Sequence, residues 1–412
     1  MRKKIFSYII DNEIGDISKK YKLIQYLKKI NNIKILYIID LTNFLLIKSQ
    51  NNFFKKKIKD VKYFRPKNFS ELLSFASKKN IYGIGPVYGN PNSIIIHILL
   101  KILKVKLILI SNWGFQLNVG MGDKEKLRDN FLSSAKFFIN IKLYYFLYRL
   151  LTVAGIVPKI NYYFETSSLR ILNLKNSLSN RIYKIFNTKI FNYFQNIKRI
   201  NSIFYDEELL RLKSKKKGSK KKYIVVVDSG YLLHPDTSIR EHLKHSEIKI
   251  RMKEYYLNLN NLLFSFKKNY KSKIIFCIHP KVKYDKKLDY KLRKNFKFVE
   301  GNTEKYISNS NLVIFTGGSS LINLAILKKK KIVFLIDKKS VYPSILISSL
   351  IKIINIKILI LEKNLVINKN KLETQLNNNI KKYEKFIREN LVSKNNEFSH
   401  MQIKNIIFKK EK

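Results

Sequence analysis

The chain has 412 residues, of which 45% are hydrophobic. This length favours two domains, and this composition argues against general disorder. Lys and Arg number 82 against 29 Asp and Glu, which gives a net charge of +53. Such a charge attracts polyanions, or else it reflects a bias of the whole sequence toward Ile, Lys and Asn. The chain carries no nucleic-acid reader motif, so we expect no nucleic-acid partner; attraction to an anionic membrane surface stays open.

The cysteine content and the apolar runs indicate the cellular setting. The single cysteine, Cys277, excludes an internal disulfide framework and a multi-cysteine zinc site. The apolar run at 5–10 is too short for a signal-peptide core and fits a first strand. Basic residues interrupt the longer apolar runs at 93–110 and 137–158, so we expect neither to span a membrane. We therefore expect a cytoplasmic protein, with peripheral attachment to the inner face of the cytoplasmic membrane left open.

The first half of the chain alternates strand-like and helix-like segments. Apolar runs predict strands at 5–10, 33–39, 81–84 and 106–110. Helical periodicity predicts helices at 19–29, 69–78 and 93–104. Alternation at these lengths is typical of βαβ units and a parallel sheet. From 124 to 212 the pattern becomes helical and aromatic, which predicts a helical insertion.

The segment 213–222, KSKKKGSKKK, is the clearest linker, because it is mostly lysine and holds no apolar side chain. After it the alternation resumes, with strands predicted at 223–227, 274–278, 296–299, 312–315, 332–336 and 358–361. Helices are predicted at 250–268, 304–308, 321–328 and 342–353, and over the last thirty-five residues. We expect two Rossmann-like α/β domains with parallel sheets flanking a cleft, at 1–212 and 223–412.

Two strands of the second half end in residues suited to bind phosphate. The run at 274–278 leads into His279-Pro280, and the run at 312–315 leads into a loop before a helical pattern. That loop reads Thr316-Gly317-Gly318-Ser319-Ser320. Glycines let a phosphate approach closely, serines offer donors at a helix start, and a His can donate to a phosphate oxygen. Because the carboxyl ends of parallel strands meet at one sheet edge, the two motifs predict one nucleotide-phosphate site.

Each motif also has a purely structural interpretation. His279 can satisfy a local carbonyl, and a serine before a helix commonly serves as its N-cap. Asp228-Ser229-Gly230 and His234-Pro235-Asp236, after the strand at 223–227, suggest either a second phosphate contact or a turn. The chain has no Walker A or G-x-G-x-x-G pattern, which disfavours an NTPase or a dinucleotide enzyme.

The order and spacing of these motifs, over roughly 223–336, resemble the C-terminal half of glycosyltransferases with the GT-B fold. In particular they resemble bacterial sialyltransferases, polysialyltransferases and capsule or lipopolysaccharide transferases, which carry an HP motif and a later Ser-Ser motif. The resemblance implies that His279 contacts the nucleotide phosphate and that Ser319 and Ser320, assisted by Thr316, hold it. It also implies that the loop from Glu300 lines the base or ribose pocket, although a plain turn remains open there.

A transferase also needs a base that deprotonates the acceptor hydroxyl. The resembling sialyltransferases use an acidic residue in an acidic-acidic-Gly motif. The nearest segment here is Asp11-Asn12-Glu13-Ile14-Gly15-Asp16, which departs from that motif at Asn12 and Ile14. The resemblance therefore proposes Asp16 as the base, with Glu13 second.

We expect an inverting, metal-independent glycosyltransferase without a cofactor. It would move a sugar from a nucleotide donor to a surface glycan or lipid-linked glycan, and the resemblance implies that the donor is CMP-linked. Two alternatives stay open: a CDP-alditol glycerol- or ribitol-phosphate transferase, and a GT-B module that binds glycan or nucleotide without turnover. A non-hydrolysing sugar-nucleotide epimerase shares the architecture, but the helix predicted at 321–328 lacks the acidic residue expected for that activity.

Overall fold

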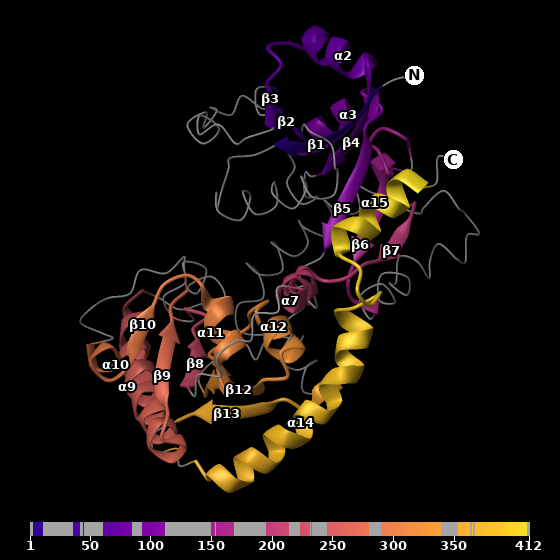
Figure 1. Cartoon of the computed structure of the whole chain (residues 1–412). Coiled ribbons are helices and arrows are strands. Elements are labelled where there is room, and N and C mark those ends of the chain that lie inside the picture. The colour runs from indigo at the N-terminus through magenta and orange to yellow at the C-terminus, as the bar shows by residue number, and fades with distance from the viewer. Residues whose placement is uncertain are drawn as a thin grey trace. The chain divides into compact units, whose positions relative to one another are not determined.

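The structure is a computed structural model of the chain, and its elements are labelled in Figure 1. It describes residues 3–10, 36–41, 44, 61–84, 93–111, 150–152, 154–168, 195–213, 223–230, 232, 245–279, 290–338, 353–362, 365 and 367–409. The helix predicted at 19–29 lies outside the described residues, as does all but the last residue of the one predicted at 342–353.

Contacts divide the chain into two compact units. Unit 1 takes the described residues up to Ser202 and again from Ser393 onward, and unit 2 takes those from Ile203 to Val392. We expected the chain to pass from the first domain to the second at 213–222, and 214–222 lies outside the described residues. Among described residues, the chain passes to unit 2 at Ile203 and returns to unit 1 at Ser393.

Unit 1 is built on a parallel sheet. In its described part the strands are β1 (Lys3–Ile10), β2 (Leu36–Asp40), β3 (Val61–Phe64), β4 (Lys79–Ile84), β5 (Lys106–Ser111), β6 (Ile160–Glu165) and β7 (Ile197–Arg199). They pair in the order β3-β2-β1-β4-β5-β6-β7, and every pairing is parallel. The described helices of this unit are α2 (Phe69–Ser77), α3 (Ser93–Ile102) and α15 (Ser399–Lys409).

The core of unit 1 follows from the apolar positions of these elements. Ile5 and Ile9 of β1 pack with Leu72 of α2 and with Leu100 of α3 in one buried cluster. Gly83 of β4 lies beneath this layer, where a Cβ would come within 2.4 Å of the Ile9 side chain. Asn68 caps α2 by accepting the Glu71 N–H, as a helix start of this kind requires. Apolar periodicity therefore located these helices correctly.

The prediction of a purely helical segment from 124 to 212 is wrong within the described residues. Strands β6 and β7 occupy 160–165 and 197–199, and β3 was not predicted either. Tyr162 and Phe164 of β6 stack at a centroid separation of 6.1 Å, because residues two apart share a face of a strand. Aromatic residues favour strands, so their recurrence was misread as helical periodicity.

Unit 2 is built on a second parallel sheet. Its described strands are β8 (Tyr223–Val227), β9 (Lys273–Cys277), β10 (Lys297–Val299), β11 (Leu312–Phe315), β12 (Lys331–Asp337) and β13 (Lys357–Leu361). They pair in the order β10-β9-β8-β11-β12-β13, and every pairing is parallel. All strands predicted for this half are therefore present, with ends shifted by a residue at most.

The helices of unit 2 cover this sheet. In its described part they are α7 (Ile203–Lys213), α9 (His245–Tyr270), α10 (Tyr290–Asn295), α11 (Thr303–Asn309), α12 (Ile322–Leu327) and α14 (Lys369–Asn390). The buried faces of α9 and α14 meet the sheet in one core cluster, to which α9 contributes Leu259, Leu263 and Phe266. The sequence pattern did not predict α10.

A single asparagine ties the C-terminal segment to unit 1. Asn201 Oδ1 accepts the N–H groups of Ser393 (2.6 Å) and Lys394 (2.9 Å), and Nδ2 donates to the carbonyls of Lys394 and Glu397 (2.6 Å each). The Asn201 N–H donates to Gln402 Oε1 at 2.9 Å. This clamp explains why α15 belongs to unit 1. None of the described helices is both long and apolar enough to cross a membrane.

Candidate active site

The carboxyl edge of the unit 2 sheet brings the predicted motifs together. Val227 at the end of β8 pairs with Cys277 of β9 on one side and with Phe315 of β11 on the other. Ser229, His279 and Gly317 each lie two residues after one of these paired positions. The three residues therefore follow the ends of neighbouring strands, each at the same distance from its last pairing. The parallel sheet thus places the HP segment and the glycine-serine loop at one edge, with Ser229 between them.

A buried hydrogen-bond network holds the ends of β8 and β11 together. Thr316 Oγ1 donates to Asp228 Oδ1 at 2.6 Å, and both residues are buried. The same Oγ1 accepts the Ser229 N–H at 2.9 Å, and Ser229 Oγ donates to the Thr316 carbonyl at 3.2 Å. Since the hydroxyl of Thr316 is used inside this network, its role here is to position the loop.

Gly317 is required by close packing against Ser229. A Cβ built on Gly317 would lie 2.6 Å from Ser229 Oγ and 2.8 Å from Ser229 Cβ, closer than real Cβ contacts come. The neighbouring Gly318 is exposed. The first glycine therefore lets two strand ends approach each other, whereas the second leaves open backbone at the loop surface.

The two serines organise the start of α12, although neither is its N-cap. Leu321 holds that position, and Ser319 Oγ accepts its N–H at 3.3 Å. The N–H groups of Ile322 and Asn323 donate to the carbonyls of Ser319 (3.3 Å) and Ser320 (3.1 Å). The first amides of this six-residue helix are thus occupied, contrary to the expectation that they would receive phosphate.

Other donors of the same loop have no acceptor among the described residues. Within the described part of the chain, the Ser320 hydroxyl and the N–H groups of Gly318, Ser319 and Ser320 make no hydrogen bond. Both serines are partly exposed at the end of the loop. The loop therefore presents hydroxyl and amide donors to solvent, the combination that binds a phosphate oxygen.

The remaining predicted residues lie along the same edge. His279 is partly buried two residues after β9, and Pro280 lies outside the described residues. Glu300 is exposed directly after β10, whose Val299 pairs with Cys277. Burial raises the pKa of the Cys277 thiol to about 12, so this thiol stays protonated and is no nucleophile. His279 is thus the described ionisable side chain that directly follows β9 at this edge.

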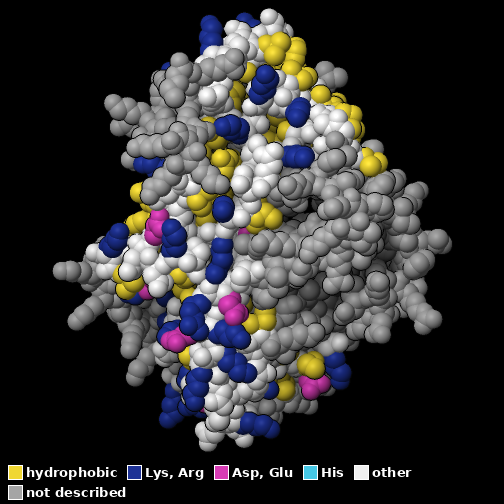
Figure 2. All heavy atoms as spheres, turned by 90° about the vertical axis from the view of Figure 1, so that its right-hand side faces the viewer, with side chains coloured by type: hydrophobic (Ala, Val, Ile, Leu, Met, Phe, Trp, Pro, Cys, Tyr) yellow, Lys and Arg dark blue, Asp and Glu magenta, His cyan; other side chains and the backbone are white. Residues whose placement is uncertain are grey.

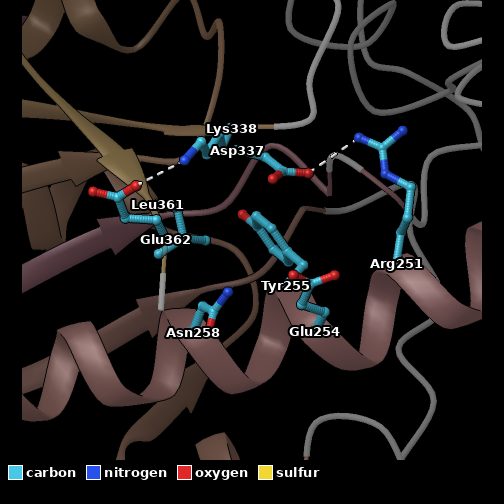
Figure 3. A pocket seen from close by; sticks show the side chains of 8 residues that line it. All are labelled: Arg251, Glu254, Tyr255, Asn258, Asp337, Lys338, Leu361 and Glu362. Atoms are coloured by element: carbon cyan, nitrogen blue, oxygen red, sulfur yellow. Dashed lines mark hydrogen bonds and ion pairs between the residues drawn. The ribbon is translucent and has the colours of Figure 1, made fainter. Parts of the chain in front are cut away.

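A polar cavity of about 290 Å³ opens further along the carboxyl edge, where β12 and β13 end against α9 (Figure 3). Arg251 donates to Asp337 Oδ2 at 3.1 Å, and each of these side chains is only 13% exposed. Lys338 pairs with Glu362 at 3.3 Å at the more exposed end. The cavity is further lined by Glu254, Tyr255, Asn258 and Leu361. Asp337 is the last residue of β12, and a carboxylate that ends an apolar strand is a signal that could have indicated this cavity from the sequence.

The corresponding edge of unit 1 carries two buried carboxylates that sequence reasoning missed. Asp40 ends β2; it accepts the Tyr63 hydroxyl and lies 3.9 Å from Arg65 Nε. Glu165 ends β6 and accepts the Tyr163 hydroxyl at 2.6 Å as well as the N–H groups of its own loop. Both carboxylates are therefore buried at strand ends and held by neighbouring side chains or by the backbone of the adjoining loop.

The predicted bases Asp16 and Glu13 lie outside the described residues, as does Asp236. The strand that precedes Glu13 and Asp16 in the sequence, β1, ends at Ile10, which pairs with Asp40. Among described residues, no group of three or more His, Cys, Asp and Glu could hold a metal ion.

Figure 2 shows Lys and Arg side chains spread over the described part of one face, with few Asp or Glu among them.

Comparisons with known proteins agree with this architecture. No protein-family model and no curated protein matches the chain. Solved structures do match over nearly the whole length. UGT2 of Phytolacca americana, solved with UDP-2-fluoro-glucose and pterostilbene, is 8% identical, with a TM-score of 0.50 over 98% of this chain and 99% of that one. UDP-GlcNAc 2-epimerase of Methanocaldococcus jannaschii is 13% identical, with a TM-score of 0.45 over 98% and 99%. The likeness to UGT2 and the two parallel-sheet units show that this chain has the GT-B fold.

Proposed function

We propose that this chain is a glycosyltransferase that binds a nucleotide-activated sugar at the carboxyl edge of the unit 2 sheet. The observation that carries the proposal is the alignment of His279, Ser229 and Gly317 at neighbouring strand ends, beside the donors of Ser319 and Ser320. These groups suit the phosphate of a donor nucleotide. The helix after the loop, α12, has no acidic side chain, which favours transfer over epimerisation of the sugar.

The chemistry follows from this placement. The acceptor hydroxyl oxygen attacks the anomeric carbon, and the bond from that carbon to the phosphate oxygen breaks, so that the nucleotide leaves with the electron pair. His279 and the donors of Ser319 and Ser320 stabilise the charge that develops on the departing phosphate. Direct displacement of this kind inverts the anomeric configuration, and it needs no cofactor and, with these donors in place, no metal.

A base must take the proton of the acceptor hydroxyl. We retain Asp16 as the first candidate and Glu13 as the second, both of which follow β1 in the sequence. Asp40, at the end of the neighbouring strand β2, is a third candidate, because Tyr63 and Arg65 hold its buried carboxylate in place. General base catalysis contributes about 10²–10⁴-fold, so the variant that removes the true base should lose turnover by that order without losing nucleotide affinity.

For the substrates, we propose a CMP-linked donor and a surface glycan or lipid-linked glycan as acceptor, as in capsule or lipopolysaccharide synthesis. The sequence resemblance supports the donor, and the net charge of +53 supports an acidic glycan or an anionic membrane in the cytoplasm as the setting.

A thermal-shift panel with CMP, CDP, UDP and GDP tests the donor site. A ligand at 100 times its dissociation constant stabilises the protein by about 2.7 kcal/mol, which is readily measured. The CMP-sugar proposal expects the largest shift from CMP. A shift confined to UDP or GDP would refute the CMP assignment and keep a nucleotide site, whereas no shift with any nucleotide would refute the donor site itself. Turnover of CDP-glycerol in place of a CMP-sugar would reassign the enzyme to alditol-phosphate transfer.

A further inference from the structure

One face of α9 carries large apolar side chains that unit 2 leaves exposed. Ile250 is 69% exposed, Leu257 46% and Phe264 50%. They are spaced seven residues apart on a helix of 26 residues, so they lie in one line along it. The opposite face is buried in the core through Leu259, among others. We call the line of Ile250, Leu257 and Phe264 the α9 stripe.

Basic side chains border the stripe on one side. At about 100° per residue, Lys249, Lys253 and Lys267 project to the same side of the line, and all three are exposed. The Lys267 ammonium lies 5.9 Å from the centre of the Phe264 ring. Glu247 and Glu254 project to the other side. The exposed Lys268 projects to that other side as well, so the stripe has one cationic border and one border of mixed charge.

The cationic border continues onto α10. Asn295 Nδ2 donates to Asn260 Oδ1 at 2.9 Å, and Lys267 Nζ donates to the Asn295 carbonyl at 3.5 Å, so α10 lies along that side of α9 (Figure 1). Arg293 and Lys294 of α10 are exposed. Arg293 lies about 200° around α10 from Asn295, and its guanidinium lies 4.6 Å from the centre of the Phe298 ring of β10. The surface therefore combines the apolar line with four basic side chains, three of α9 and Lys294 of α10.

We propose that this surface docks on an anionic lipid membrane, with the α9 stripe inserted among the lipids and its cationic border on the headgroups. Charge complementarity supports this occupant, because an interfacial helix pairs an apolar face with Lys and Arg. A coiled-coil partner fits less well: the residues three and four after each stripe member include Lys253, Glu254, Lys267 and Lys268, whereas a helical seam needs apolar residues there. This inference deepens the proposed membrane setting by naming the surface.

Vesicle co-sedimentation of the full chain tests the proposal without donor or acceptor, so its outcome is separate from that of the nucleotide panel. We expect binding to vesicles of equal parts phosphatidylcholine and phosphatidylglycerol, little binding to phosphatidylcholine alone, and loss of binding as salt rises. The triple variant Ile250→Gln, Leu257→Gln, Phe264→Gln should lower the partition about tenfold or more, since each side chain loses its apolar burial.

Matched variants distinguish loss of the α9 stripe from loss of exposed apolar side chains elsewhere in the chain. The control Ile95→Gln, Ile102→Gln, Leu210→Gln removes side chains exposed to 51%, 50% and 49% elsewhere in the chain, and it should bind as the parent does. Lys253→Gln should weaken binding to anionic vesicles about fivefold.

Three results would overturn the proposal. These are equal binding to neutral vesicles, equal loss in the stripe and control variants, and no vesicle binding at all. If in the last case the parent self-associates in sedimentation and the stripe variant does not, a second copy of the chain covers the stripe.

Discussion

Gly317 lies so close to Ser229 that the end of β11 has no room for a Cβ. The nearest atoms, Ser229 Oγ and Cβ, would be 2.6 Å and 2.8 Å away. Rotation of the serine side chain relieves the first contact and leaves the second. The strand end that carries the glycine-serine loop is thus fixed by its neighbour β8, two residues after the last paired position.

Gly317→Ala should therefore destabilise unit 2 by about 1–3 kcal/mol, the usual cost of overpacking. Thermal and denaturant unfolding measure the loss. The double variant Gly317→Ala, Ser229→Gly removes both crowded atoms and should recover part of it, compared with Ser229→Gly alone. An alanine variant as stable as the parent would show that the two strand ends separate easily.

Thr316→Val should cost about 2 kcal/mol, because it removes a hydroxyl that donates to the buried Asp228 carboxyl and accepts the Ser229 N–H. Thr316→Ser keeps the hydroxyl and is the matched control. Chemical denaturation compares the two variants. Equal stability of the valine and serine variants would argue that water replaces the threonine hydroxyl.

His279→Ala should weaken nucleotide binding about tenfold while leaving the unfolding temperature of the ligand-free protein nearly unchanged, since this side chain is only partly buried. Isothermal titration with the nucleotide that gives the largest thermal shift measures the affinity. Ser320→Ala should also weaken binding, because the Ser320 hydroxyl, which makes no hydrogen bond with a described residue, is proposed to donate to the nucleotide phosphate. Unaltered affinity in both variants would move the phosphate away from this edge.

The stability of the fold should rise with pH above about 8 through Lys328. Burial, reinforced by the nearby Lys330, lowers the pKa of this ammonium to about 8, although it forms an ion pair with Glu208 of α7. Between about pH 8 and its unfolded value of about 10.4, the unfolded chain holds the proton that the folded chain has released, so stability increases. Below pH 8 both states are protonated and the cost of burying the charge is present in full.

Lys328→Met should remove that rise and should be neutral or stabilising at pH 7, because a buried charge pair commonly stabilises less than an apolar side chain of similar size. The difference between parent and variant unfolding free energies across pH 7–10 isolates this group. Lys329→Met, an exposed neighbour paired with Glu384, is the control and should leave the profile unchanged. A strongly destabilised methionine variant would mean that the Glu208 pair outweighs burial.

Asn201→Ala should loosen the C-terminal segment from unit 1. It removes four side-chain hydrogen bonds to the backbone of 393–397, at a cost on the order of 3 kcal/mol or more. Hydrogen exchange should speed up at Ser393, Lys394 and α15. Asn196→Ala removes another bond within unit 1, to the Asn161 carbonyl, and should not affect α15. Unchanged exchange would show that the buried Ile403 and Ile407 hold α15 by themselves.

The strands of unit 2 could be predicted from local pattern, because each is a short apolar run bounded by turn or charged residues, and the central strands β8, β9, β11 and β12 are largely buried. The sequence likewise determined that His279 and the loop from Thr316 follow strand ends, since chain order alone places them there. The same local pattern was misleading at β6, because Tyr162 and Phe164 fit the helical period as well as the strand period. Pairing with a neighbouring strand distinguishes the two.

How those strand ends are used depends on which strands pair in the folded chain. Pairing of β8 with β11 turned Thr316 inward onto Asp228, so its hydroxyl holds the loop. The same is true of Asn201, which holds residues far along the chain. Local pattern fixes which residues can form a strand or a loop, whereas hydrogen-bond partners distant in sequence depend on which elements the fold brings into contact.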